Sequence, residues 1–151
     1  MFIKAKKSLG QNFLIDRDVL ELIVETAKVT NKSILEIGPG NGALTTFILK
    51  KNPKKFYAIE KDNDLALLLE DKFTNEIKII NDDVLKISED KISDEKLTVF
   101  GNLPYNISTE ILCNWIINLT NKNCWFSELV LMFQKEVADR IVAEFNTSAY
   151  G

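Results

Sequence analysis

The chain contains no histidine in its 151 residues. Histidine is the commonest general base near neutral pH and a frequent metal ligand. Its absence excludes a Ser-His-Asp hydrolase and any metal centre built on imidazole, and we expect no metal. Only two cysteines occur, Cys113 and Cys124, and they fit neither a metal spacing nor a disulfide framework. Free thiols indicate a reducing compartment, so we expect a cytoplasmic protein.

Long apolar segments are also lacking. No apolar run approaches the roughly 20 residues that span a bilayer, and residues 1–7 lack the apolar core of a secretory signal. We therefore expect no membrane partner. The apolar fraction of 46% is ordinary for a globular chain, and the length suits one domain with a buried core. We assign residues 1–151 to that domain.

Charge is nearly balanced along the chain as a whole. The net charge of −3 argues weakly against a nucleic-acid partner, although an average hides local patches. Lysines gather in residues 1–15 and again in residues 50–55. Each cluster is either a phosphate contact or an ordinary solvated face, and the sequence leaves both readings open.

Strand-like and helical patterns alternate along the chain. Strands are predicted at 33–37, 56–59, 76–80, 97–100 and 128–133, and helices at 16–27, 43–51, 64–73, 108–119 and 135–144. Strands separated by helices of this length form parallel, right-handed crossovers. The predicted fold is α/β, with a doubly wound, mostly parallel sheet whose ligands bind beyond the carboxyl ends of the strands.

Three predicted strands end in residues that suit a nucleoside. The loop 38–42 has the spacing G-x-G-x-G, and glycine lets a backbone approach a ligand closely. Glu60 follows about 20 residues later, where an acid accepts hydrogen bonds from ribose hydroxyls. Either Asp82 or Asp83 is placed to accept from an adenine amino group. A nicotinamide-dependent dehydrogenase is the alternative, although its usual loop is G-x-G-x-x-G and its usual proton donor is histidine.

The most informative stretch is Asn102-Leu103-Pro104-Tyr105, which follows the fourth predicted strand. A side-chain amide and a backbone carbonyl accept hydrogen bonds from an exocyclic amine, and an aromatic ring stacks on a flat base. Proline keeps such a turn rigid. We interpret the stretch as a binding site for an amine-bearing base. The alternative is a plain loop with a buried tyrosine.

These residues give the chain a family resemblance over essentially its whole length. It resembles the small-subunit ribosomal RNA adenine dimethyltransferases, which use S-adenosylmethionine. The resemblance is carried by residues 9–14, 36–40, Glu60, 83–85, 101–108 and 134–137. It implies a Rossmann-like methyltransferase fold, an RNA partner inside an immature small ribosomal subunit, and S-adenosylhomocysteine as the product.

The resemblance also implies residue roles. Residues 1–15 would form a basic arm that closes over the cofactor, and Asp83 rather than Asp82 would contact its adenine. Implied cofactor contacts are Asn12, Leu14, Gly38, Gly40, Glu60, Asp83 and Asn102. Implied catalytic residues are Asn102, Leu103, Pro104 and Tyr105, whose hydrogen bonds would aim the N6 lone pair of adenine at the methyl group.

Members of that family continue beyond the equivalent of Gly151, with further strands, a second aromatic and a helical RNA-binding domain. We therefore expect these last strands and the C-terminal helical domain to be missing here. The strand 128–133 would then be an exposed apolar edge that favours self-association, and cofactor binding and activity would be weak. A non-catalytic RNA-binding scaffold is the alternative function.

Overall fold

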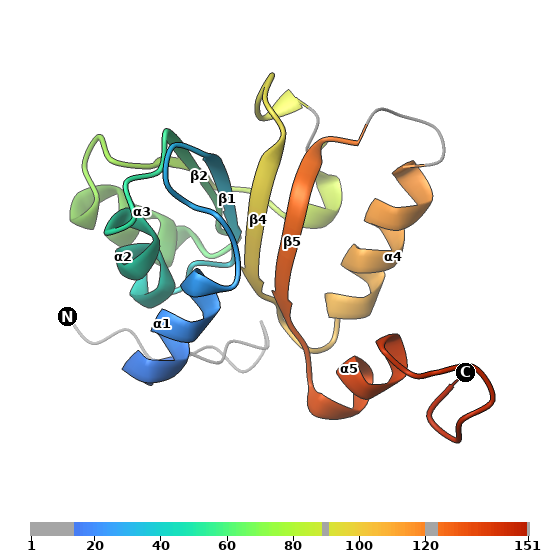
Figure 1. Ribbon diagram of the computed structural model, residues 1–151. Coiled ribbons are helices and arrows are strands. Elements are labelled where there is room, and N and C mark those ends of the chain that lie inside the picture. The colour runs from blue at the N-terminus through green and yellow to red at the C-terminus, as the bar shows by residue number, and fades with distance from the viewer. Residues whose placement is uncertain (1–13, 89–90, 120–123, 151) are drawn as a thin grey trace.

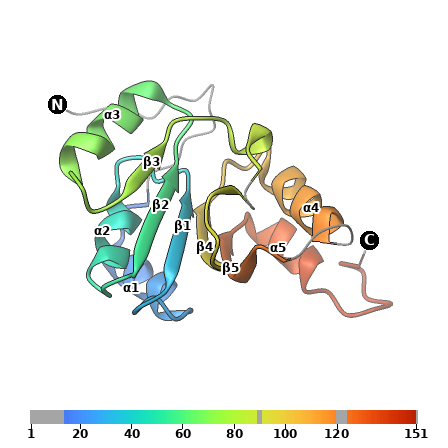
Figure 2. The ribbon, with the colours of Figure 1, turned by 90° about the horizontal axis from the view of Figure 1, so that it is seen from above.

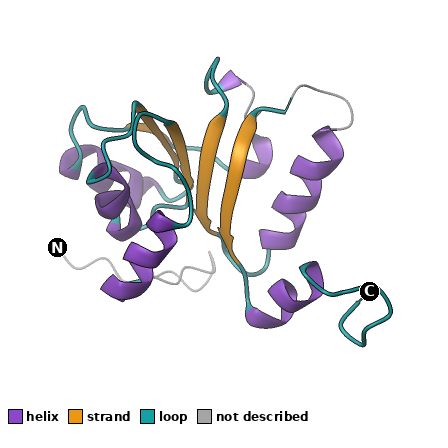
Figure 3. Ribbon diagram, viewed as in Figure 1, coloured by secondary structure: helices purple, strands orange, loops and turns teal. Residues whose placement is uncertain are grey.

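The computed structural model describes residues 14–88, 91–119 and 124–150. These parts form a parallel sheet with helices on both faces (Figures 1 and 3). The strands are β1 (Ser33–Ile37), β2 (Lys55–Ile59), β3 (Lys78–Ile80), β4 (Leu97–Asn102) and β5 (Phe126–Met132). The helices are α1 (Arg17–Glu25), α2 (Ala43–Leu49), α3 (Asn63–Lys72), α4 (Ser108–Leu119) and α5 (Lys135–Ile141), with a 3-10 turn η2 (Val84–Lys86).

The strand order is β3-β2-β1-β4-β5, and each described pairing is parallel. Helices α1 to α3 gather on one side of the sheet and α4 and α5 on the other (Figures 1 and 2). The predicted doubly wound α/β architecture is therefore confirmed. β5 pairs only with β4 within the described sheet, so the prediction that this strand forms an edge is also confirmed.

The core lies on both faces of the sheet, and β1 contributes to each. Ile34 packs in a cluster with Leu20 of α1 and Ile48 of α2, whereas Leu35 packs in a second cluster with Trp115 of α4. A strand buried on both faces needs a nearly continuous apolar run, which is the pattern seen in the sequence. Each such side chain contributes roughly 1.5–3 kcal/mol on burial. None of the described helices is long and apolar enough to span a membrane.

The predicted bounds of most elements differ from the observed ones by one to three residues; α5, for example, ends at Ile141 and not at residue 144. Two further differences concern the strand ends. β4 continues two residues past Phe100, because Gly101 and Asn102 still pair with Leu131 and Met132 of β5. Asn102 is therefore the last residue of a strand and not the first residue of a loop. The 3-10 turn η2 was not predicted, since three residues are too few to show a helical period.

Gly42 fixes how α2 meets α3. It precedes α2 with φ of 75°, a left-handed conformation that glycine adopts without strain. A Cβ atom at this position would lie 2.5 Å from Cε2 of Phe73, at the end of α3. The third glycine of the loop is therefore required by helix packing, independently of any ligand.

We predict that Gly42→Ala lowers the free energy of unfolding by about 2–4 kcal/mol, because it adds both backbone strain and overpacking. Urea unfolding measures this change. Asn75→Ala is the matched control, since Asn75 is exposed and has φ of 64°; we expect it to cost about 1 kcal/mol from strain alone. Equal effects of the two substitutions would show that the contact with Phe73 is not restrictive.

Candidate functional site

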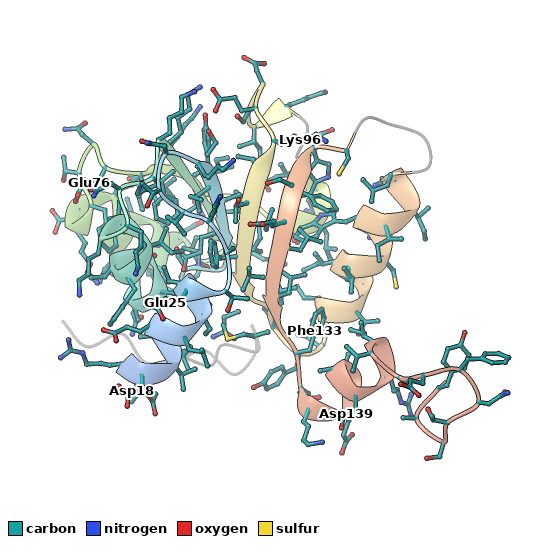
Figure 4. All side chains as sticks on the ribbon, in the orientation of Figure 1. Asp18, Glu25, Glu76, Lys96, Phe133 and Asp139 are labelled. Carbon is teal, nitrogen blue, oxygen red and sulfur yellow. The ribbon has the colours of Figure 1, made fainter. Side chains whose placement is uncertain are left out.

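The candidate site lies at the carboxyl ends of the strands. Lys96, just before β4, and Phe133, just after β5, mark the two ends of this strand pair (Figure 4), and the site is at the Phe133 end. Neighbouring strands β3, β2, β1 and β4 bring their final residues to this one edge, as predicted. Asn12 and the rest of residues 1–13 lie outside the described residues.

A cavity at this edge brings four of the predicted cofactor residues together. Leu14, Gly38, Gly40 and Asn102 all line it. Glu36, the fourth residue of β1, lines it too. The cavity thus joins the segment before α1, the glycine loop and the end of β4, which are far apart in the sequence.

The glycine loop is laid across the ends of two strands. The Gly38 N–H donates to the Ile59 carbonyl of β2 at 2.9 Å. Gly38 has φ of 64°, and a Cβ atom there would stand 3.8 Å from the Asn102 carbonyl oxygen of β4. The loop backbone therefore lies against both β2 and β4, beside the cavity that Gly38 and Gly40 line.

Glu60 anchors the same loop. Its Oε2 accepts the Gly40 N–H at 3.0 Å, and its Oε1 accepts the Asp62 N–H at 2.9 Å. Burial raises the pKa of the Glu60 carboxyl, and these backbone donors oppose that rise. A carboxylate oxygen has two lone pairs, so each oxygen can still accept one further donor such as a hydroxyl.

The two aspartates after β3 have different surroundings. Asp83 forms an ion pair with Lys61 at 2.7 Å and accepts the Leu85 N–H at 3.1 Å. The hydrogen bond from Lys61 lowers the pKa of Asp83, which keeps it an ionised acceptor. Asp82 is exposed and accepts the N–H of Asp83 at 2.7 Å. This supports Asp83 as the ligand contact, although that role stays a prediction.

In the stretch from Asn102 to Tyr105, the middle residues are fixed by packing and a hydrogen bond, and the last residue is exposed to solvent. The Leu103 side chain is buried in the core, at 1% exposure. The Pro104 carbonyl accepts the N–H of Ser108 at 3.0 Å, which ties the turn to the start of α4. Tyr105 is 46% exposed. The alternative of a loop with a buried tyrosine is therefore wrong.

Glu36 is a site residue that the sequence reasoning missed. It is 2% exposed, and its Oε2 accepts the Thr45 hydroxyl at 2.7 Å. Burial raises the pKa of Glu36 to about 8; Glu60 raises it further, whereas Thr45 and Lys72 lower it. The signal in the sequence is a carboxyl group inside a largely apolar strand, but the same residue also begins the glycine motif and is not distinguished from it.

The sequence matches the family described as ribosomal RNA adenine dimethylase over residues 2–151. It is 72% identical, over its whole length, to the ribosomal RNA small subunit methyltransferase A of Pelagibacter ubique. The chain spans 57% of that relative, slightly more than half.

Two solved structures resemble the fold closely. A dimethyladenosine transferase from Plasmodium falciparum has a TM-score of 0.78 at 28% identity, with 92% of this chain and 49% of that one covered. The 23S rRNA methyltransferase ErmE has a TM-score of 0.72 at 28% identity, with 85% and 50% covered. The predicted Rossmann-like methyltransferase fold is confirmed. Neither the dehydrogenase nor the scaffold alternative is favoured.

The raised pKa of Glu36 predicts a pH-dependent stability. A carboxyl whose folded pKa of about 8 exceeds its unfolded value of 4.5 contributes stability that is complete below pH 4.5. That contribution is lost as the pH rises towards 8. Glu36→Gln removes this pH dependence. We therefore expect the free energy of unfolding of the variant, relative to that of the wild type, to increase between pH 5 and 8.

Each pKa unit corresponds to about 1.36 kcal/mol, so the gain reaches on the order of 4 kcal/mol. Urea unfolding at a series of pH values measures it. The control is Glu70→Gln, which changes an exposed acid on α3. A difference between wild type and Glu36→Gln that does not vary with pH would contradict a buried, protonated Glu36.

Proposed function

The chain belongs to the ribosomal RNA adenine dimethylase family, and we propose that it transfers methyl groups from S-adenosylmethionine to N6 of small-subunit ribosomal RNA adenines. The observation that carries this proposal is the position of Asn102, which ends β4 on the cavity and adjoins the turn bearing the exposed Tyr105. The proposed partner is an immature small ribosomal subunit, and the proposed location is the cytoplasm.

The residues present fit the methyl donor. The remaining lone pairs of Glu60 suit ribose hydroxyls, and the ionised Asp83 suits the adenine amino group. Gly38 and Gly40 allow close approach of the donor to the main chain, and Asn12 and Leu14 are proposed to close over it. The bound donor supplies a methyl group that is already activated on a sulfonium.

Catalysis then depends on orienting the target amine. Its lone pair is delocalised into the adenine ring, so N6 is a poor nucleophile. We assign two acceptors for its N–H groups, the Asn102 side-chain oxygen and the Leu103 backbone carbonyl, which favour a pyramidal nitrogen. The buried Leu103 side chain and the tied Pro104 carbonyl hold this geometry in advance. Tyr105 supplies a face on which the base stacks, and positioning provides the rate without a strong base.

We expect Asn102→Ala to reduce methyl transfer by at least about 100-fold, because it removes an acceptor that aligns N6. The same substitution spares cofactor binding more than Glu60→Ala does. Glu60→Ala deletes a proposed ribose contact and also releases the N–H groups of Gly40 and Asp62. Tritium transfer to unmodified small-subunit RNA measures activity, and calorimetric titration with S-adenosylhomocysteine measures binding.

Glu70→Gln serves as the control for both measurements, since the exposed Glu70 lies outside the proposed site. Wild-type turnover in Asn102→Ala would overturn the catalytic assignment. Binding of NAD in preference to S-adenosylhomocysteine by the unaltered chain would overturn the proposed function as a whole.

The chain is also proposed to self-associate through β5. This strand pairs on one side only among the described strands, and its residues 129–132 are only partly buried. An edge strand with apolar residues and unpaired backbone groups is a template for pairing with another chain. Charged residues discourage such pairing. Here they lie only near the ends of the segment, at Glu128 and Lys135.

Sedimentation should therefore show association that grows with concentration in the range of about 10–100 µM. Alternate N–H groups of an edge strand face outwards, so either Val130→Pro or Leu131→Pro removes only an outward donor. We expect that one of these variants stays folded by circular dichroism and becomes monomeric. A wild-type chain that remains a monomer throughout this range excludes pairing through β5.

A further inference from the structure

Two buried carboxyl groups flank the glycine loop, and neither forms an ion pair among the described residues. Glu36 and Glu60 are 2% and 6% exposed. The ion pairs found in the described ranges involve other acids. Buried charges in proteins are normally paired with an opposite charge. With both carboxyl groups ionised, the site would therefore have more negative charge than the described ion pairs neutralise.

Glu36 also keeps one oxygen available to the cavity. Thr45 donates to its Oε2, and no hydrogen bond to Oε1 is found among the described residues. Every fully buried side-chain nitrogen or oxygen in the described parts nevertheless has a partner. Oε1 has no such partner in those parts and is therefore not fully buried. We infer that it faces the cavity that Glu36 lines together with Gly38 and Asn102.

The charges around Glu36 favour its protonated form before a ligand arrives. Glu60, at the end of β2, repels an ionised Glu36, and burial opposes ionisation more strongly still. Lys72 of α3 acts in the opposite direction, but its ammonium group is exposed and donates to the Asn41 carbonyl at 3.1 Å. Thr45 is the neutral partner contributed by α2.

We propose that the Glu36 carboxyl releases its proton to solvent when the cationic methyl donor binds, so that the carboxylate and the donor's onium charge neutralise each other in the cavity. This inference rests on the proposed function and assigns Glu36 a binding role there. S-adenosylmethionine has two positively charged groups, the sulfonium and the α-ammonium. Either one can neutralise the ionised Glu36 carboxylate.

Donor affinity then depends on pH in a defined direction. Ionisation of Glu36 must accompany binding, so affinity is greatest above pH 8, where Glu36 is already ionised. It falls by up to about tenfold per unit as the pH drops below that value. Glu36→Gln cannot ionise and removes this dependence.

The test is calorimetric titration of the 151-residue chain at pH 7 in two buffers of different ionisation enthalpy. Three probes are compared: S-adenosylmethionine, S-adenosylhomocysteine, which keeps only the ammonium, and 5′-methylthioadenosine, which has neither charge. We expect S-adenosylmethionine to release about 0.9 proton, because a group with a pKa of about 8 is mostly protonated at pH 7. Methylthioadenosine should release none.

S-adenosylhomocysteine identifies the charge involved: equal release assigns the ammonium, and no release assigns the sulfonium. Glu36→Gln should bind the donor without releasing a proton, and the matched variant Glu70→Gln should behave as the wild type. Thr45→Val removes the donor to Oε2, so the pH above which proton release ceases should move upwards.

Proton release that is unchanged in Glu36→Gln, or equal for methylthioadenosine and S-adenosylmethionine, would overturn this inference and leave the proposed function intact. So would wild-type binding of the donor with no proton release. Failure of all three adenosyl probes to bind would instead overturn the proposed function, and the inference with it.

Discussion

The Glu60 carboxylate is the link on which the arrangement of the site depends. It accepts one N–H from Gly40 after β1 and one from Asp62, whose own side chain caps α3. A single side chain thereby fixes the glycine loop, the end of β2 and the start of α3 relative to one another. Hydrogen bonds to charged groups contribute about 1.5–3 kcal/mol each. Since both of these hydrogen bonds form within the chain, the glycine loop is already positioned before any ligand binds.

The same region contains buried acids, Glu36 and Glu60, that do not favour the stability of the fold. Glu36 and Glu60 are both buried near the same loop, and burial and the charge of Glu60 both raise the cost of ionising Glu36. A well-packed apolar residue at position 36 would avoid desolvation and repulsion. The site therefore holds an electrostatic strain that a cationic ligand relieves, and strain of this kind is typical of functional sites and not of cores. The predicted stability gain of Glu36→Gln measures that strain directly.

The sequence predicted the sheet and the meeting of its strand ends, because topology alone brings the carboxyl ends of parallel strands to one edge. That is why Glu60 and Asn102 could be grouped without coordinates. The role of Gly42 could not be predicted, because it depends on Phe73, some 30 positions away, whose ring leaves no room for a Cβ atom at position 42. Glu36 was missed for a related reason. Its protonation depends on burial and on Glu60, and neither is visible in a local motif.

Asn102 separates two environments, and this arrangement suits a reaction between two ligands. On one side it lines the cavity with Glu36 and the glycine loop; on the other, the turn continues to Tyr105, which is 46% exposed. In the proposed reaction the donor occupies the enclosed side, and the RNA base reaches the turn from solvent. Glu36 on the cavity side is buried, so charges interact more strongly there than in water, whereas the open side can accept a large polymer. Because Asn102 ends a strand paired on both sides, it holds its position between the two ligands more firmly than a loop residue would.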